Sequence, residues 1–291
     1  MLECGTTNPE PVQTVRKADA RFDSRRIYTV LVLAPLLYGA IRFLPPFAFT
    51  CLVAAAGSLA LYELYRLCFP SPPHPLTVGI GLVGCTALIV APHQPNMAVP
   101  SLLAALVGIL SIPLLVRISL DDRLKEGAIT LTGMLYIGLT LSYLVMTRLL
   151  PHGEWLIFFL LLVTWAGDTG AYYMGTLCGQ HPLAPRISPK KTVEGLVGGL
   201  IGAIIVAYAA SWWFLPDLSG LDCVILAVFL TIVGLWGDLA ESAIKRSVGA
   251  KDSGGVLPGH GGMLDRVDSL LFTAPAFYYY TTMISGIGAH T

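Results

Sequence analysis

Charged residues are scarce in this sequence. Asp, Glu, Lys and Arg make up 12% of its 291 residues, whereas a soluble domain carries roughly 25%. The segments 67–116, 127–147 and 269–291 contain none of the four. A stretch of about 20 apolar residues is enough for one helix to cross a bilayer. The scarcity of charge therefore excludes an ordinary soluble domain and predicts an integral membrane protein.

Net charge and cysteine patterns are lacking too. The 18 basic residues balance the 18 acidic ones, so we expect no electrostatic attraction to nucleic acid. The six cysteines occur singly, without a C-x-x-C motif, which argues against a zinc site or a disulfide framework. Residues 1–26 are polar, and no short apolar core with a small-residue cleavage site follows them. We therefore expect no cleaved signal peptide.

The alternating pattern of β-strands is absent as well, and lipid accepts only helices or closed barrels. The predicted fold class is an all-α, polytopic membrane protein with about nine transmembrane helices. The apolar segments lie at 27–44, 47–69, 76–92, 98–117, 127–150, 155–175, 192–214, 221–247 and 264–287.

The basic residues predict the orientation of these helices. With the N-terminus in the cytoplasm, every Lys and Arg except Arg42 and Arg148 falls on the inner side. Cytoplasmic loops are enriched in Lys and Arg. We therefore expect a cytoplasmic N-terminus and an external C-terminus.

The first five apolar segments contain few side chains that could take part in catalysis or ligand binding. Gly79–Gly84 reads GIGLVG and matches a nucleotide-binding pattern, but no strand precedes it and it lies in a charge-free run. We interpret it as a site of close helix packing. For Glu63 we favour an ion pair with Arg66, three residues later, although an acid this near the membrane can also be functional.

The sixth segment contains Asp168 in the stretch WAGDTGAYYMG, toward its cytoplasmic end. A carboxylate within the membrane is costly and needs a partner. A functional role is the prediction, and a structural pair or a water-filled pocket is the alternative. The seventh segment has glycines at G-x-x-x-G spacing, which predict close helix contact: Gly195, Gly198, Gly199 and Gly202.

The loop before the seventh segment reads SPKKTVEG and is predicted to lead directly into a helix. Thr192 or Ser188 could cap that helix, and Glu194 suits the positive end of its dipole. Lys190 and Lys191 beside a helix N-terminus suit a polyphosphate. They would serve equally well as anchors on the inner side of the membrane.

The stretch between the last two apolar segments, GDLAESAIKRSVGAKDSGGVLPGHGGMLDRVDS, is the most informative part of the chain. Asp238, Glu241 and Lys245 are spaced i, i+3 and i+7, so a helix places them on one face. Asp265 and Asp268 share a face in the same way. The GHGG turn between them can expose backbone N–H groups to an anion.

Under the predicted topology, these acids and bases all lie on the inner side of the membrane. Carboxylates without thiolates or a histidine cluster suit Mg²⁺ or another hard cation, and Lys and Arg suit phosphate. The sequence therefore predicts a site for a metal ion and a polyphosphate at the inner leaflet. A soluble nucleotide and a lipid head group could both reach it.

The run Ser242–Asp268 resembles the signature of phosphatidate cytidylyltransferases, also called CDP-diacylglycerol synthases. Asp168–Tyr172 and Ser188–Gly195 look like this family too, whereas the first five helices match it only in character. Thr176 and Gln180 stand where the family usually has basic residues, so no phosphate contact is assigned to them. The signature is matched at Ser242, Lys245, Arg246, Lys251, Asp252, Pro258, His260, Gly261, Gly262, Asp265, Arg266 and Asp268.

The resemblance implies an enzyme of phospholipid biosynthesis that converts CTP and phosphatidate into CDP-diacylglycerol and pyrophosphate. It implies Mg²⁺ and a second cation, with K⁺ as the candidate, and a homodimer. We expect a polar cytoplasmic segment over residues 1–26 and about five helices over 27–150. The catalytic site is expected on about four helices over 151–291. The expected location is a bacterial inner membrane, with the site on the cytoplasmic side and membrane lipid around it.

Site roles follow from the acids and bases together with the resemblance. The predicted metal ligands are Asp168, Asp238, Asp265 and Asp268. The predicted catalytic residues are Asp238, Lys245, Arg246, Lys251, His260, Asp265 and Arg266. The predicted substrate-binding residues are Ser188, Lys190, Lys191, Thr192, Glu194, Gly261 and Gly262.

Three other functions are alternatives to this one. A CTP-dependent lipid-alcohol kinase would use a related membrane site but transfer the γ-phosphoryl group. A CDP-alcohol phosphotransferase is disfavoured because its D-G-x-x-A-R type of acidic motif is missing. An ion-coupled transporter also buries acids, but its site lies near mid-bilayer between repeats. This chain shows no internal repeat.

Overall fold

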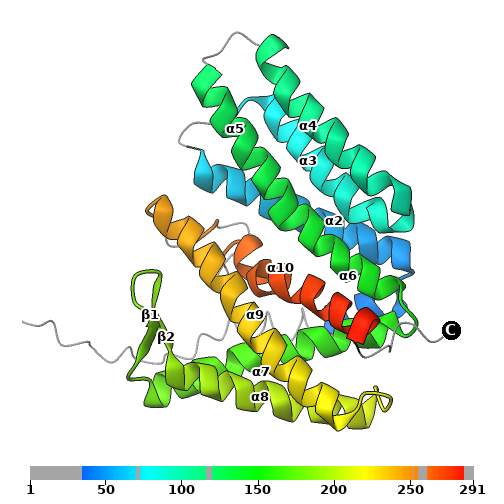
Figure 1. Cartoon of the computed structure of the whole chain (residues 1–291), viewed down its shortest axis with the longest axis vertical. Coiled ribbons are helices and arrows are strands. Elements are labelled where there is room, and N and C mark those ends of the chain that lie inside the picture. Colours follow the sequence, from blue (N-terminus) through cyan, green and yellow to red (C-terminus); the bar gives the residue numbers. More distant parts are fainter. Residues whose placement is uncertain (1–34, 70–72, 116–119, 251, 255–260, 285–291) are drawn as a thin grey trace, which may run out of the picture.

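Helices make up almost all of the architecture (Figure 1). The structure, a computed structural model, describes residues 35–69, 73–115, 120–250, 252–254 and 261–284. Residues 35–43 are helical. The helices after them are α2 (Pro46–Cys68), α3 (Pro75–Val90), α4 (Ala98–Leu115), α5 (Leu120–Gly133), α6 (Thr140–Leu149), α7 (Gly153–Cys178), α8 (Val193–Trp213), α9 (Gly220–Ser247) and α10 (Leu264–Tyr279).

Short helical turns complete the chain path. The 3-10 turns η1 (Ala91–His93) and η2 (Pro95–Met97) connect α3 to α4. The π-helical turns η3 (Met134–Leu139) and η4 (Tyr280–Ile284) join α5 to α6 and extend α10.

The predicted all-α membrane class is confirmed. Each predicted apolar segment coincides with a helix wherever the structure describes it. Six helical spans are long and apolar enough to cross a bilayer: 46–68, 75–93, 124–149, 153–178, 193–213 and 220–247. The count of nine crossings and the orientation stay predictions, and the segment 1–26 lies outside the described residues.

The N-terminal region, α2 to α6, packs through large apolar side chains. Leu61 of α2, Ile89 of α3 and Ile137 of η3 are fully buried in this core. The GIGLVG stretch lies within α3, where Gly81 faces the Tyr65 side chain and Gly84 faces Met134. Its interpretation as a helix-packing site is confirmed.

The α7–α8 pair packs backbone against backbone. A Cβ atom on Gly170 would collide with the carbonyl oxygen of Gly198, and one on Gly199 would lie 2.9 Å from the carbonyl oxygen of Gly167. Only glycine allows two helices to approach this closely. The predicted role of the G-x-x-x-G spacing is therefore confirmed.

Helices α9 and α10 lie between these two parts of the molecule (Figure 1). Helix α10 packs against α9, and it also contacts α2, α6 and α7. Phe277 of α10 stacks on Phe159 of α7 with ring centroids 5.8 Å apart. Helix α10 therefore contacts both regions.

A small antiparallel hairpin, β1 (Pro182–Ala184) and β2 (Ser188–Thr192), precedes α8. The sequence prediction of a plain loop at this position was wrong. The amide of Ile187 donates to the Ala184 carbonyl (3.1 Å) and closes the turn. Strands of three and five residues are too short to show a period-2 pattern, so the pairing left no signal in the sequence.

Candidate active site

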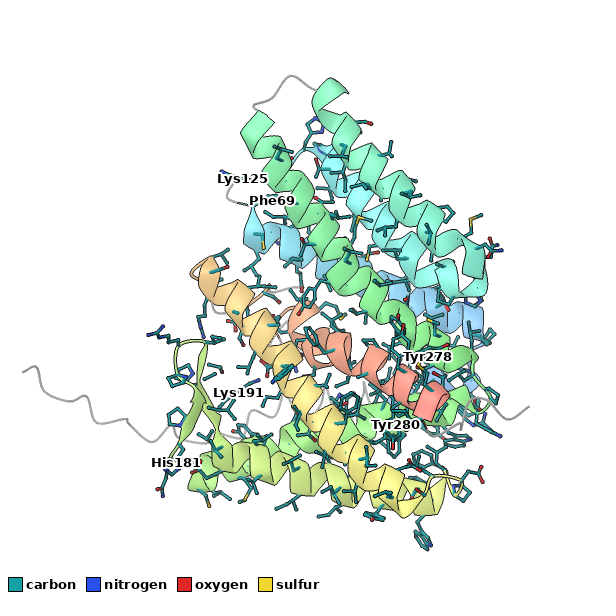
Figure 2. The ribbon with its side chains drawn as sticks, viewed as in Figure 1. Phe69, Lys125, His181, Lys191, Tyr278 and Tyr280 are labelled. Carbon is teal, nitrogen blue, oxygen red and sulfur yellow. The ribbon has the colours of Figure 1, made fainter. Side chains whose placement is uncertain are left out.

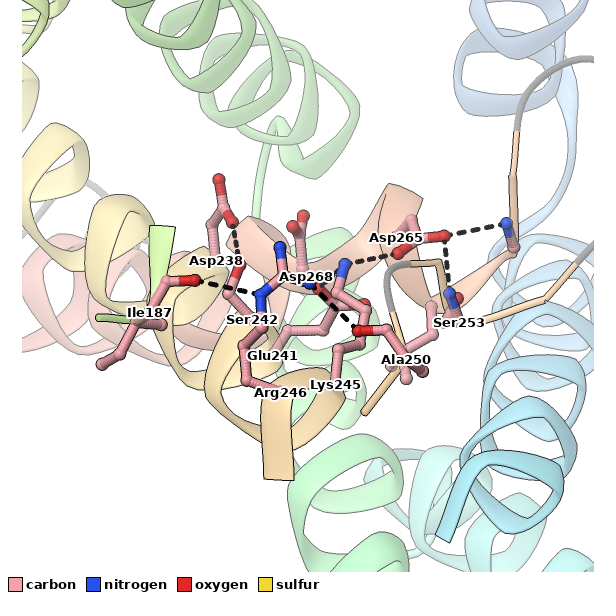
Figure 3. A network of polar contacts seen from close by, with 12 residues as sticks. Ile187, Asp238, Glu241, Ser242, Lys245, Arg246, Ala250, Ser253, Asp265 and Asp268 are labelled. Carbon is pink, nitrogen blue, oxygen red and sulfur yellow. Dashed lines mark hydrogen bonds and ion pairs between the residues drawn. The ribbon is translucent and has the colours of Figure 1, made fainter. Parts of the chain in front are cut away.

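Helix α9 presents one polar face, as the i, i+3, i+7 spacing predicted (Figure 3). The Ser242 hydroxyl donates to Asp238 Oδ1 (3.2 Å). One turn further on, the Lys245 ammonium pairs with Glu241, and its Nζ also donates to Asp265 Oδ1 of α10 (2.7 Å). Lys245 therefore ties the polar face of α9 to the first turn of α10.

Three carboxylates from α9 and α10 form a compact cluster. One oxygen from each of Asp238, Glu241 and Asp268 lies within 4.8 Å of the other two. Glu241 is fully buried, and the Lys245 ammonium is the cation paired with its carboxylate. Close carboxylates repel one another, and the two lysines that pair with the cluster, Lys191 and Lys245, carry less charge than its three carboxylates. Oxygen donors with lone pairs to spare suit a hard divalent cation such as Mg²⁺.

A cavity of about 360 Å³ opens beside this cluster, between α7, β2, α8 and α9. Asp168 of α7 and Asp238 of α9 both line it. Lys191 of β2 enters it from the hairpin and forms an ion pair with Asp238 Oδ2 (2.5 Å), and Figure 2 shows Lys191 between β2 and α9. The Asp238 carboxylate also repels those of Asp168 and Asp268.

The walls of the cavity are both polar and apolar. Asp168, Lys190 and Lys191 line it, and so do Leu196 and Leu230. The tightly packed α7–α8 pair forms one side. A molecule with a charged head and an apolar portion would match such walls.

The hairpin and the start of α8 contribute the other predicted substrate-binding residues. Thr192 is the N-cap of α8, since its hydroxyl oxygen accepts from the amide of Gly195 (3.1 Å). Ser188, the alternative cap, lies instead at the start of β2, although it lines the cavity together with Thr192. Glu194 is not among the residues that line the cavity, and its Oε1 lies 2.5 Å from Nδ1 of His181.

Asp265 stands beside the three-carboxylate cluster rather than in it. Its Oδ2 accepts from the amides of Gly262 (3.0 Å) and Ser253 (3.2 Å), and its Oδ1 accepts from Lys245. Gly261 has φ +77°, which favours glycine. Asp265 therefore links Ser253 and Gly262, which lie on either side of residues 255–260. Its direct binding of a metal stays a prediction.

Arg246 and Arg266 are not among the residues that line the cavity. Arg246 donates from Nε to the Ile187 carbonyl (3.3 Å) and from Nη1 to the Ala250 carbonyl (3.2 Å), so it braces the hairpin against the end of α9. Arg266 is exposed in the first turn of α10. Lys251 and His260 lie outside the described residues.

Sequence reasoning placed Glu241 on the polar face of α9 but omitted it from the metal ligands. It also missed Tyr136 of η3, whose buried hydroxyl has no hydrogen-bond partner in the described part of the chain and interacts electrostatically with the cluster. A π-helical turn often marks a functional position, but the sequence does not reveal one.

The favoured pairing of Glu63 with Arg66 was wrong. Oε2 of Glu63 accepts a hydrogen bond from the amide of Leu264 (2.9 Å), and Arg66 is exposed. The only signal in the sequence was the presence of an acid in an otherwise apolar helix.

Comparison with known proteins extends over nearly the whole chain. A model described as the cytidylyltransferase family matches residues 24–284. The phosphatidate cytidylyltransferase of Bacillus subtilis (strain 168) is 35% identical over 264 residues, which cover 87% of this chain and 96% of the relative. That of Staphylococcus saprophyticus is 43% identical over 150 residues, covering 52% and 57%. The uncharacterized protein YnbB of Escherichia coli (strain K12) is 42% identical over 153 residues, covering 51% of each.

Proposed function

The chain belongs to the cytidylyltransferase family, and from this premise we infer that it is a phosphatidate cytidylyltransferase. It transfers the cytidylyl group of CTP to phosphatidate and releases pyrophosphate, which makes CDP-diacylglycerol for phospholipid biosynthesis. The observation that carries this inference is the near full-length similarity to a phosphatidate cytidylyltransferase. The resemblance predicted from Ser242–Asp268 agrees with it.

The proposed reaction is an in-line displacement at phosphorus. A phosphate oxygen of phosphatidate forms a bond to the α-phosphorus of CTP. The bond from that phosphorus to the oxygen bridging to the β-phosphorus breaks, and pyrophosphate leaves with its electron pair. The nucleophile is already an anion, so the site needs no strong general base. Positioning and neutralisation of charge supply the catalysis.

The basic residues of the cavity suit this task. Lys190 and Lys191 line the cavity from β2, where they can bind phosphate oxygens. Lys191 is held in place by its ion pair with Asp238. Lys245 neutralises the carboxylates of Glu241 and Asp265 and so holds α9 and α10 together. Lys251, His260 and the glycines Gly261 and Gly262 stay candidates for pyrophosphate contacts.

We propose Mg²⁺ as the cofactor, with Asp238, Glu241 and Asp268 as the residues that would hold it. Their oxygens lie within 4.8 Å of one another, and Asp168 faces the same cavity. Bound there, Mg²⁺ would neutralise charge on the triphosphate. A second cation, with K⁺ as the candidate, rests on the family resemblance alone.

The apolar part of the cavity suits the lipid substrate. Leu196 and Leu230 offer a surface for the apolar portion of phosphatidate, while the charged head group meets Lys190 and Lys191. The resemblance also supports a homodimer in a bacterial plasma membrane, with the site on the cytoplasmic side. The bacterial source of the relatives fits that location.

The experiment that tests the function follows both products at once. Purified protein in detergent is incubated with Mg²⁺, phosphatidate and CTP labelled at the α- or γ-phosphate. We expect α-label to enter the lipid phase, with an equal amount of pyrophosphate released. Transfer of γ-label to an added lipid alcohol would identify a kinase instead. No turnover by folded protein with either substrate would reopen the transporter hypothesis.

A further inference from the structure

Glu63 is the only acid of α2, and its carboxylate is buried against residues that lie between the end of α9 and the first turn of α10. Its relative exposure is 1%. Its Oε2 accepts a hydrogen bond from the amide of Leu264, a residue 201 positions later in the chain, and Oε1 has no hydrogen-bond partner among the described residues. A buried carboxylate without a basic partner costs stability. Its presence therefore calls for a role beyond packing.

The hydrogen bond from Leu264 stabilises the start of α10. The N-cap residue, Met263, provides no side-chain cap of its own. An acceptor at this place satisfies one of the free amides of the first turn, and its negative charge suits the positive end of the helix dipole. Glu63 therefore caps α10 from a different helix.

Two glycines of the loop pack closely around the Glu63 carboxylate. A Cβ atom on Gly254 would lie 3.0 Å from Oε1, and one on Gly262 would lie 2.5 Å from Oε2. These glycines are in the described residues on either side of 255–260. The neighbouring Ser253 amide and the Gly262 amide both donate to Asp265. The two flanks of the loop are thus held between two carboxylates, Glu63 and Asp265.

We propose that Glu63 is a positioning residue for cytidylyl transfer. By holding the first turn of α10 and both flanks of the loop, it sets where Asp265 and Asp268 stand relative to α9. Asp268 belongs to the three-carboxylate cluster, so a shift of this turn would move a metal ligand. The inference rests on the proposed function and gives the N-terminal region a direct part in it.

The first test compares Glu63→Ala and Glu63→Gln with the unaltered enzyme in the CDP-diacylglycerol assay. Because misplacing a site by about 1 Å can cost about 100-fold in rate, we expect a loss of kcat of that order for Glu63→Ala, with KM for CTP nearly unchanged. Glu63→Gln keeps an oxygen that can accept from Leu264, so it should lose less. The matched control is Glu154→Gln. Glu154 contacts Arg42 and Arg148, about 20 Å along α7 from Asp168 at 1.5 Å per residue, so activity should be unchanged.

The amount of folded protein is measured for each variant by size-exclusion chromatography and thermal unfolding, and kcat is expressed per folded molecule. A purely structural role would lower the yield or the melting temperature and leave this kcat unchanged. That result would overturn the proposal. A drop in kcat per folded molecule, with KM preserved, supports it.

A second test uses the contact between Gly254 and Glu63. The φ angle of Gly254 is not in the positive range, so an added methyl group is opposed by the Glu63 side chain rather than by the backbone. We expect Gly254→Ala to lower kcat in the unaltered enzyme and to lower it less in the Glu63→Asp background, where the carboxylate is withdrawn. Additive effects of the two changes would contradict the contact.

The two proposals fail in different ways. If the unaltered enzyme makes no CDP-diacylglycerol, the proposed function fails, and the Glu63 variants are not needed to show it. If the unaltered enzyme is active and Glu63→Ala is equally active per folded molecule, only the positioning role fails.

Discussion

The N-terminal region, α2 to α6, and the C-terminal region, α7 to α10, are both built from apolar helices, but they differ in what the helices bury. Across α2, α3 and α4 the only charged residues are Glu63 and Arg66. In the C-terminal region, Asp168, Glu241 and Lys245 lie in or beside long apolar helices. Buried charge is costly unless it is paired or functional, so its uneven distribution locates the site.

The two regions also use glycine differently. In the N-terminal region, Gly84 and Gly133 make room for the side chains of Met134 and Leu61. In the C-terminal region, Gly170 and Gly199 let the backbones of α7 and α8 approach each other. Side chains can shift to accept a new neighbour, whereas a backbone cannot do so cheaply. The wall of the cavity is therefore expected to be the more rigid part.

The largest expected difference between the regions concerns a carboxylate. Asp238→Asn removes a charge from the three-carboxylate cluster and from the ion pair with Lys191. We expect turnover to fall by about 10³-fold. Glu126→Gln is the matched change in the N-terminal region, where the carboxylate accepts from Thr77 (3.2 Å), and it should leave turnover unchanged. Turnover is measured with α-labelled CTP. Equal losses in the two variants would contradict the assignment of the active site to the C-terminal region.

The next effect concerns a lysine. Lys191→Ala removes the cation that pairs with Asp238 inside the cavity. We expect kcat/KM to fall by about 10–100-fold, in line with the loss of one charge-assisted contact of about 1.5–3 kcal/mol. Lys125→Ala, at an exposed position of α5, should have no effect. Steady-state kinetics with varied CTP test the pair, and a normal kcat/KM for Lys191→Ala would rule out its role in phosphate binding.

A third prediction compares glycines through stability. Gly170→Ala places a methyl group against the Gly198 backbone and should lower the free energy of unfolding by about 1–3 kcal/mol. Gly84→Ala should cost less, because the flexible Met134 side chain can move. Gly79→Ala meets nothing within 4 Å and should be neutral or slightly stabilising. Thermal unfolding in detergent gives the order, and a Gly170→Ala variant as stable as Gly79→Ala would contradict backbone-limited packing.

The smallest effect is expected at the border between the regions. Tyr136→Phe removes a buried hydroxyl near the cluster that has no hydrogen-bond partner among the described residues. We expect this hydroxyl to donate to a substrate or cluster oxygen during the reaction, so losing a neutral hydrogen bond of about 1 kcal/mol should lower kcat by several-fold. Tyr143→Phe removes the hydroxyl that lies 2.7 Å from that of Tyr279 and should leave kcat unchanged. If both variants behave alike in the labelled-CTP assay, Tyr136 plays no part in the reaction.

Much of the fold was predictable because membrane helices follow local rules. Long apolar runs located most of the helices within a few residues, although α5 begins at Leu120, ahead of the predicted start at 127. The spacing of Asp238, Glu241 and Lys245 correctly assigned them to one face. The same local logic failed at the hairpin before α8, where the strands are short. The sequence also placed Asp265 among the metal ligands and left Glu241 out. In the structure, Asp265 accepts hydrogen bonds from loop amides, whereas Glu241 belongs to the three-carboxylate cluster.

By itself, the sequence determined the class of the protein, the positions of its helices and the family of its site, because hydropathy, helical periodicity and a contiguous motif are all local properties. Only the tertiary structure decided which carboxylates meet and that Lys191 reaches Asp238 from a hairpin. It also decided that Glu63 caps α10 across 201 residues. These contacts depend on how helices distant in sequence cross one another. The residue pattern of one helix does not show which other helix it will cross.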